Sequence, residues 1–134
     1  MQLFSDTVGM QVTLSSHGVY HLKYHVVWVC KYRRKVLSPG VESTLRKLLP
    51  QLLRSMPGAA IETIGFDRDH LHTVIIILPK YAIATVMATL KSQSASYLRK
   101  KYPFLTKVYW KENIVWSPGY FISSIGLDFL EPLF

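Results

Sequence analysis

The sequence is most informative at YHLKYHVVW, residues 20–28, where the side chains alternate in character. Every second position holds an apolar or aromatic residue, and the positions between them hold His21, Lys23, His25 and Val27. Period two with β-branched and aromatic residues is typical of a strand that packs one face on a core. The stretch therefore predicts a first strand whose even-numbered side chains are buried.

Two helices and three further extended segments are expected after this strand. Ser38-Pro39 supplies an N-cap and a first helical residue, and apolar residues recur at helical spacing as far as Leu53. Pro50 is expected to kink or divide this helix, and Pro57-Gly58 to end it. The remaining expected elements are strands at 60–66 and 70–78, a helix at about 83–101, and extended segments at 114–116 and 120–125.

The expected order is β-α-β-β-α-β, which predicts an α+β protein of the ferredoxin-like class. In that arrangement two helices cover one face of an antiparallel sheet, and the first strand lies beside the third at the sheet centre. The other face stays open to a ligand or partner. We expect residues 1–16 to form a loosely specified arm and residues 17–134 to form one domain.

Composition limits the classes of function. The formal net charge is +8 and the isoelectric point is about 9.7, which favours a polyanionic partner, either nucleic acid or a membrane surface. Cys30 is the single cysteine, so an internal disulfide and a cysteine-rich zinc site are excluded, as suits a reducing cytoplasm. The amino terminus does not resemble a signal peptide, and the longest apolar run, 73–78, is too short to span a membrane.

The motif Asp69-His70-Leu71-His72 is the clearest candidate for chemistry. On a strand, His70 and His72 point to the same sheet face, so that two imidazoles lie within reach of one divalent ion. His25 is expected on the same face, and Asp67 and Asp69 are placed to support an imidazole. The alternative is a pair of exposed polar histidines beside an ordinary turn built by the two aspartates.

Basic residues gather in two clusters that suit a phosphate backbone. Aromatic residues lie among them at Tyr32, Tyr102, Tyr109 and Trp110, and cations beside stacking surfaces are typical of sites for unpaired bases. The alternative is a solvated basic surface over buried aromatics. The predicted nucleic-acid contacts are Lys31, Arg33, Arg34, Lys35, Lys91, Arg99, Lys100 and Lys101.

Several segments, in the right order and spacing, resemble the single-tyrosine HUH transposases of the insertion-sequence 200/605 group. The resemblance runs from about His17 to Gly126, and its motifs are residues 24–37, Asp69–His72, Leu90-Lys91-Ser92 and residues 116–121. It implies a cytoplasmic homodimer that moves single-stranded DNA with hairpin ends. It also implies that His70 and His72 hold Mg²⁺ or Mn²⁺, with His25 and Asp69 in support, while a tyrosine attacks the scissile phosphate.

The sequence departs from that family at two places. Some members carry a carboxylate five residues before the first motif histidine, where this chain has Gly65; Asp67 or water is the expected substitute. The family's nucleophilic tyrosine follows the segment matching residues 124–126, and the last tyrosine printed here is Tyr120, in a strand motif. We therefore expect cleavage to be deficient and keep Tyr120 only as a fallback nucleophile.

Two other functions remain open at this point. One is a non-catalytic nucleic-acid-binding domain that uses its open sheet face without metal, which predicts aromatic side chains beside His70 and His72. The other is a metal-dependent hydrolase with water as nucleophile, which requires a third acidic ligand near the histidines.

Overall fold

The computed structural model describes residues 13–15, 18–110 and 113–130. Strand β2 (Gly18–Val29) is followed by helix α1 (Pro39–Leu52), strands β3 (Ala60–Phe66) and β4 (His70–Ile77), helix α2 (Ile83–Lys101) and strand β5 (Phe121–Leu130). This is the predicted β-α-β-β-α-β order. The smaller elements are strand β1 (Thr13–Ser15), helix α3 (Phe104–Val108) and the 3-10 turns η1 (Lys31–Arg33) and η2 (Leu53–Ser55).

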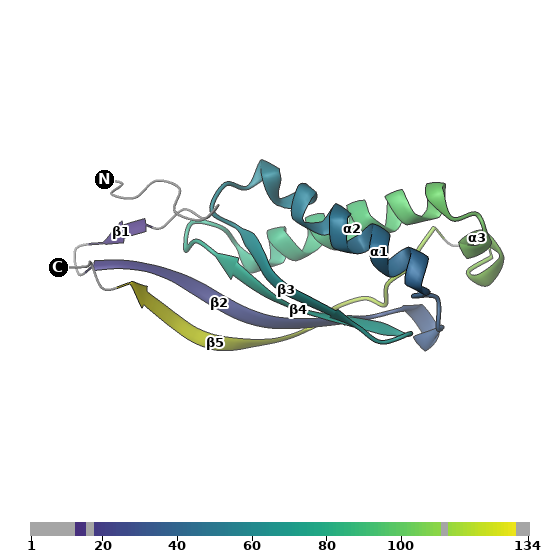
Figure 1. The fold of residues 1–134 in the computed structure, drawn as a ribbon, viewed down its shortest axis with the longest axis horizontal. Coiled ribbons are helices and arrows are strands. Elements are labelled where there is room, and N and C mark those ends of the chain that lie inside the picture. The colour runs from purple at the N-terminus through teal and green to yellow at the C-terminus, as the bar shows by residue number, and fades with distance from the viewer. Residues whose placement is uncertain (1–12, 16–17, 111–112, 131–134) are drawn as a thin grey trace.

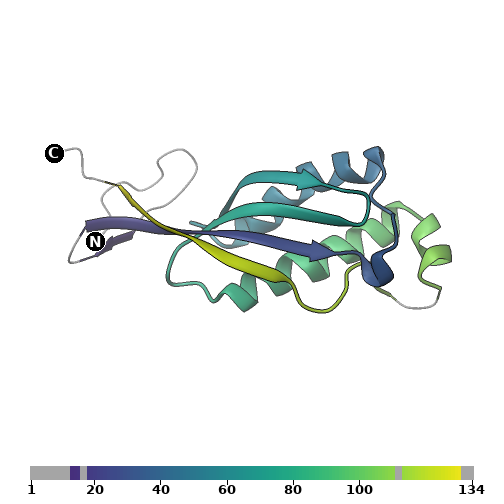
Figure 2. The same cartoon turned by 90° about the horizontal axis from the view of Figure 1, so that it is seen from below.

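The sheet is antiparallel throughout its described pairs, and β2 lies at its centre between β4 and β5. The main strand order is β5-β2-β4-β3, as Figure 2 shows, with helices α1 and α2 together on one face (Figure 1). The predicted ferredoxin-like class, including the neighbouring first and third strands, is therefore confirmed. The described helices include none long and apolar enough to cross a membrane.

Burial follows the alternation of the central strands. Val26 and Trp28 of β2 and Leu71 and Ile75 of β4 are fully buried beneath the helices. Trp28 meets the ring of Trp116 edge to face, with 5.9 Å between ring centroids. Residues between these positions on β2 and β4 face the open side. Because a strand alternates, anchoring the apolar set also fixes which side chains the open face presents.

Local structure differs from the expectations at five places. Thr13–Ser15 form a strand on β2 within the predicted arm, whose residues 1–12 and 16 lie outside the described residues. Pro50 does not divide α1. A proline at this position, in the last turn, removes only the backbone hydrogen bond to the carbonyl of Arg46. The chain then tightens into the 3-10 turn η2. Helix α3 was not predicted. The segment expected at 114–116 makes an isolated bridge between Cys30 and Trp116, and β5 runs on to Leu130.

Candidate metal and nucleic-acid site

The register of the sheet places one row of residues across the open face. Phe121 of β5 pairs with Val27 of β2, Val27 pairs with His72 of β4, and His72 pairs with Gly65 of β3. His70 lies two residues from His72, and the ring centroids are 6.4 Å apart. His25 is also near, at 6.1 Å from the ring of His72. The structure thus brings the three predicted histidines together on the open face.

His70 is held between two carboxylates. Its Nδ1 lies 2.8 Å from Oδ1 of Asp69, and its Nε2 lies 2.9 Å from Oδ2 of Asp67. Asp69 is also paired with Arg33, whose Nη2 is 3.2 Å from Oδ2. The hydrogen bond from His70, followed by the charge of Arg33, keeps the pKa of Asp69 below its usual value. Both aspartates named from the sequence therefore contact the same imidazole.

His72 is oriented differently, by the absence of a side chain on the neighbouring strand. A Cβ placed on Gly65 would lie 2.1 Å from Cε1 and 2.5 Å from Nε2 of His72. These distances are far below van der Waals contact, so the imidazole fills the space that a side chain would need. The exposed ring of His72 lies across β3 because Gly65 leaves that space open.

These donors fit a divalent ion only in part. Adjacent ligands on an octahedral ion with bonds of about 2.1 Å lie about 3 Å apart, which is the spacing of His70 Nε2 and Asp67 Oδ2. Asp69 on the other nitrogen has the place of a carboxylate that orients a metal-binding histidine. Within the described residues, however, no three His, Cys, Asp or Glu side chains are gathered as a ready cluster.

The basic cluster at residues 31–35 extends from this site. Arg33 reaches Asp69, while Arg34 and Lys35 are exposed. Tyr32 and Arg33 have left-handed backbone, with φ of 58° and 51°, a conformation uncommon outside glycine. Tyr32 is 60% exposed, and the ammonium of Lys31 lies 5.2 Å from its ring centroid. The turn presents an aromatic ring and cations at the same end of the sheet as His70.

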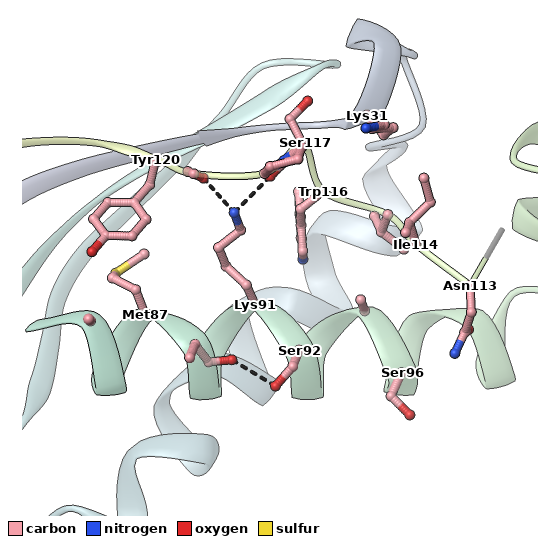
Figure 3. Close-up of a pocket in the computed structure, with 16 residues that line it drawn as sticks. Lys31, Met87, Lys91, Ser92, Ser96, Asn113, Ile114, Trp116, Ser117 and Tyr120 are labelled. Atoms are coloured by element: carbon pink, nitrogen blue, oxygen red, sulfur yellow. Dashed lines mark hydrogen bonds between the residues drawn. The ribbon is translucent and has the colours of Figure 1, made fainter.

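The other predicted contacts have mixed environments. Lys91 is half-buried and donates hydrogen bonds to the carbonyl oxygens of Ser117 and Gly119, which anchors the segment before β5 (Figure 3). Arg99 donates to the carbonyl of Ile114 at 3.1 Å. Lys100 and Lys101 are exposed on α2. Two of the predicted DNA contacts, Lys91 and Arg99, thus bind backbone carbonyl oxygens of this chain. The charges along the sequence do not indicate this arrangement.

Tyr120 lies in the segment that Lys91 anchors. It is half-buried and lines two cavities, of about 590 and 460 Å³. The larger one lies between α2 and residues 113–120, as Figure 3 shows. The sequence alone does not indicate this cavity, because it lies between α2 and residues 113–120, which come from further along the chain.

Comparisons with known proteins agree on one group. Residues 18–132 match the family described as IS200-like transposases. The chain is 33% identical over 108 residues to the ISDra2 transposase TnpA of Deinococcus radiodurans, spanning 81% of this chain and 76% of that protein. It is 29% identical over 115 residues to the transposase for insertion sequence element IS200 of Salmonella typhimurium, spanning 83% and 72%.

Two solved structures share the fold. A protein of Deinococcus radiodurans R1 assigned as a transposase superposes with a TM-score of 0.75 at 25% identity, over 85% of this chain and 86% of that one. A REP-associated tyrosine transposase bound to a REP hairpin superposes with a TM-score of 0.56 at 15% identity, over 85% and 62%. The second likeness concerns the fold alone.

Proposed function

The chain belongs to the IS200-like transposase family, and we propose that it binds single-stranded DNA with hairpin ends and holds a scissile phosphate at His70 and His72. The observation that carries the proposal is the pair of imidazoles on the open sheet face, with His70 fixed between Asp67 and Asp69. The net charge of +8 and the exposed cations beside that face supply attraction for a phosphate backbone.

In this proposal Mg²⁺ or Mn²⁺ is held by His70 and Asp67, with His72 as the third protein ligand. When bound, such an ion stabilises charge on a transferring phosphoryl group. Asp69 orients the imidazole of His70 through Nδ1, and Arg33 holds Asp69 in place. His25 lies near His72, with 6.1 Å between the ring centroids.

Strand transfer also needs an oxygen nucleophile in line with the phosphorus. The printed sequence has no tyrosine after Tyr120, and residues 121–130 are strand rather than helix. Tyr120 is therefore kept as the fallback nucleophile of the described residues. A denaturing gel with labelled element-end DNA and Mn²⁺ tests this, and an adduct that disappears in Tyr120→Phe would identify Tyr120 as the nucleophile.

We further propose a cytoplasmic homodimer that merges two sheets. β5 is an edge strand ten residues long, and its outer edge offers backbone groups to a second copy. Phe121, Ile122 and Ile125 are large apolar residues exposed along it. Sedimentation at tens of micromolar, roughly the range of a weak dimer, tests this part separately from DNA binding.

The proposed function is tested by gel shifts at several salt concentrations. We expect single-stranded and hairpin DNA to bind more tightly than a plain duplex, and affinity to fall steeply as salt rises. Equal affinity for all three DNAs would contradict the proposal. It would favour a non-catalytic nucleic-acid-binding domain, for which the supporting observation is the exposed Phe121 in the same row as His72, with Val27 of β2 between them.

A further inference from the structure

The larger cavity is an open one that lies between two elements that are far apart in the sequence. One face of α2 forms its floor, and residues 113–120 form its opposite wall (Figure 3). Small side chains at Ala84, Ala88 and Ala95 recur along that face of the helix and leave the space open. Its volume of about 590 Å³ lies in the range of ordinary small-molecule sites.

The charged side chains that line the cavity within the described residues are positive. Among the described residues, its lining includes Lys31 and Lys91 and no Asp or Glu. Lys91 bonds to two carbonyl oxygens, which are neutral, and an ammonium has three hydrogens to donate. Burial lowers the pKa of Lys91, so its positive charge is incompletely solvated. An anionic group at the cavity would compensate this charge.

The remaining lining suits a flat aromatic group. Met87, Ile114 and the alanines are apolar, and Tyr120 presents a ring at one end of the cavity (Figure 3). Asn113 places an amide at the other end, which can donate and accept hydrogen bonds. An apolar slot with a few polar groups and a nearby cation matches a nucleobase joined to a phosphate.

The cavity lies close to the histidine site through a shared wall. Residues 117–120 also line the cavity of about 460 Å³, together with Arg33 and Phe121. Arg33 pairs with Asp69, which contacts His70. A DNA strand whose phosphate lies at the histidines would therefore pass Arg33 and Phe121 before it reaches residues 117–120, which Lys91 anchors.

We propose that the cavity between α2 and residues 113–120 binds one unpaired nucleotide, with its base on the apolar floor and its phosphate at Lys91 and Lys31. The inference rests on the proposed nucleic-acid partner. It adds a site, separate from the histidines, that grips a nucleotide neighbouring the scissile phosphate.

The test fills the cavity without touching either lysine. Ala88→Leu and Ala95→Leu each place a larger side chain on the face of α2 that lines the space, and Gln93→Leu makes the same kind of change on an exposed part of α2 outside the lining. The probes are the 5′-phosphorylated thymidine trinucleotide and thymidine monophosphate, titrated by NMR into the whole chain. We expect the two filling variants to bind about tenfold more weakly or worse, a loss of about 1.4 kcal/mol, and Gln93→Leu to bind like the parent.

The outcomes separate the sources of the ligand. Binding of the trinucleotide but not the monophosphate identifies a DNA strand as the ligand, and equal binding identifies a free nucleotide; both support the cavity as a nucleotide site. If Ala88→Leu and Ala95→Leu, shown to be folded by circular dichroism, bind as well as Gln93→Leu, the proposal is overturned. It is also overturned if the parent binds hairpin DNA but neither small probe, a result that leaves the proposed function intact.

Discussion

His70 and His72 lie two residues apart on one strand and face the same side, yet they are positioned by different forces. His70 is fixed by charged partners, because carboxylates lie within 2.9 Å of both ring nitrogens. His72 is exposed, and its place follows from the missing side chain at Gly65. Hydrogen bonding orients the first imidazole and steric freedom orients the second, so different substitutions should disturb each of them.

The largest effect on His72 is expected from Gly65→Glu. A Cβ at this position overlaps the imidazole, so the ring must leave its place over β3. We expect manganese affinity to fall by about tenfold or more, on the scale found when a site's geometry is lost. Isothermal titration measures this, and Thr63→Glu is the control because it adds the same carboxylate to an exposed position of β3. Tighter binding by Gly65→Glu would contradict the account, since it would show that a carboxylate there serves as a ligand.

A smaller effect is expected at His70 from Asp69→Asn. The substitution keeps the size of the side chain but weakens the bond that orients Nδ1 and the pairing with Arg33. Loss of such an orienting carboxylate lowers metal affinity by about 10- to 100-fold, and we expect the lower end because Asp67 still faces Nε2. Glu62→Gln is the control: Glu62 is another acid of the sheet, bonded to Lys23. Equal losses in both variants would mean that net charge, rather than orientation, sets affinity.

The smallest effect concerns acid stability. The folded protein lowers the pKa of Asp69, so this group contributes stability above its unfolded pKa of about 3.9, and the contribution is lost as pH falls through the lower folded value. We expect the urea midpoint of the parent to drop more between pH 6 and pH 3 than that of Asp69→Asn. If the urea midpoints of the two proteins fall by the same amount, the charged pairing of Asp69 with His70 does not contribute to stability, and the account is contradicted on this point.

The sequence predicted the side of the sheet on which the histidines lie, because alternation in β2 and β4 is a local property of each strand. It also named Asp67 and Asp69 as support for an imidazole, and both contact His70, but it did not predict what orients His72. The role of Gly65 depends on its pairing with His72, and that register arises between two strands. For the same reason Gly65 was interpreted only as a missing ligand, although the structure shows that a side chain there would displace His72.

Lys91 and β5 illustrate the same limit. Lys91 carries a charge in a basic sequence, and its bonds to Ser117 and Gly119 depend on how the segment before β5 crosses α2. The extension of β5 beyond residue 125 is stabilised by pairing with β2, although Gly126 and Asp128 have low strand propensity. Contacts between distant segments override local preference in both cases.

Manganese binding by the parent and by the His70→Ala, His72→Ala double variant tests the central claim most directly. Electron paramagnetic resonance reports free Mn²⁺ in a titration, and circular dichroism checks that the double variant is folded. The account predicts that the parent removes Mn²⁺ from the free pool and that the double variant does not. Equal binding by the two proteins would place the metal elsewhere and contradict the assignment of the open sheet face as the site of chemistry.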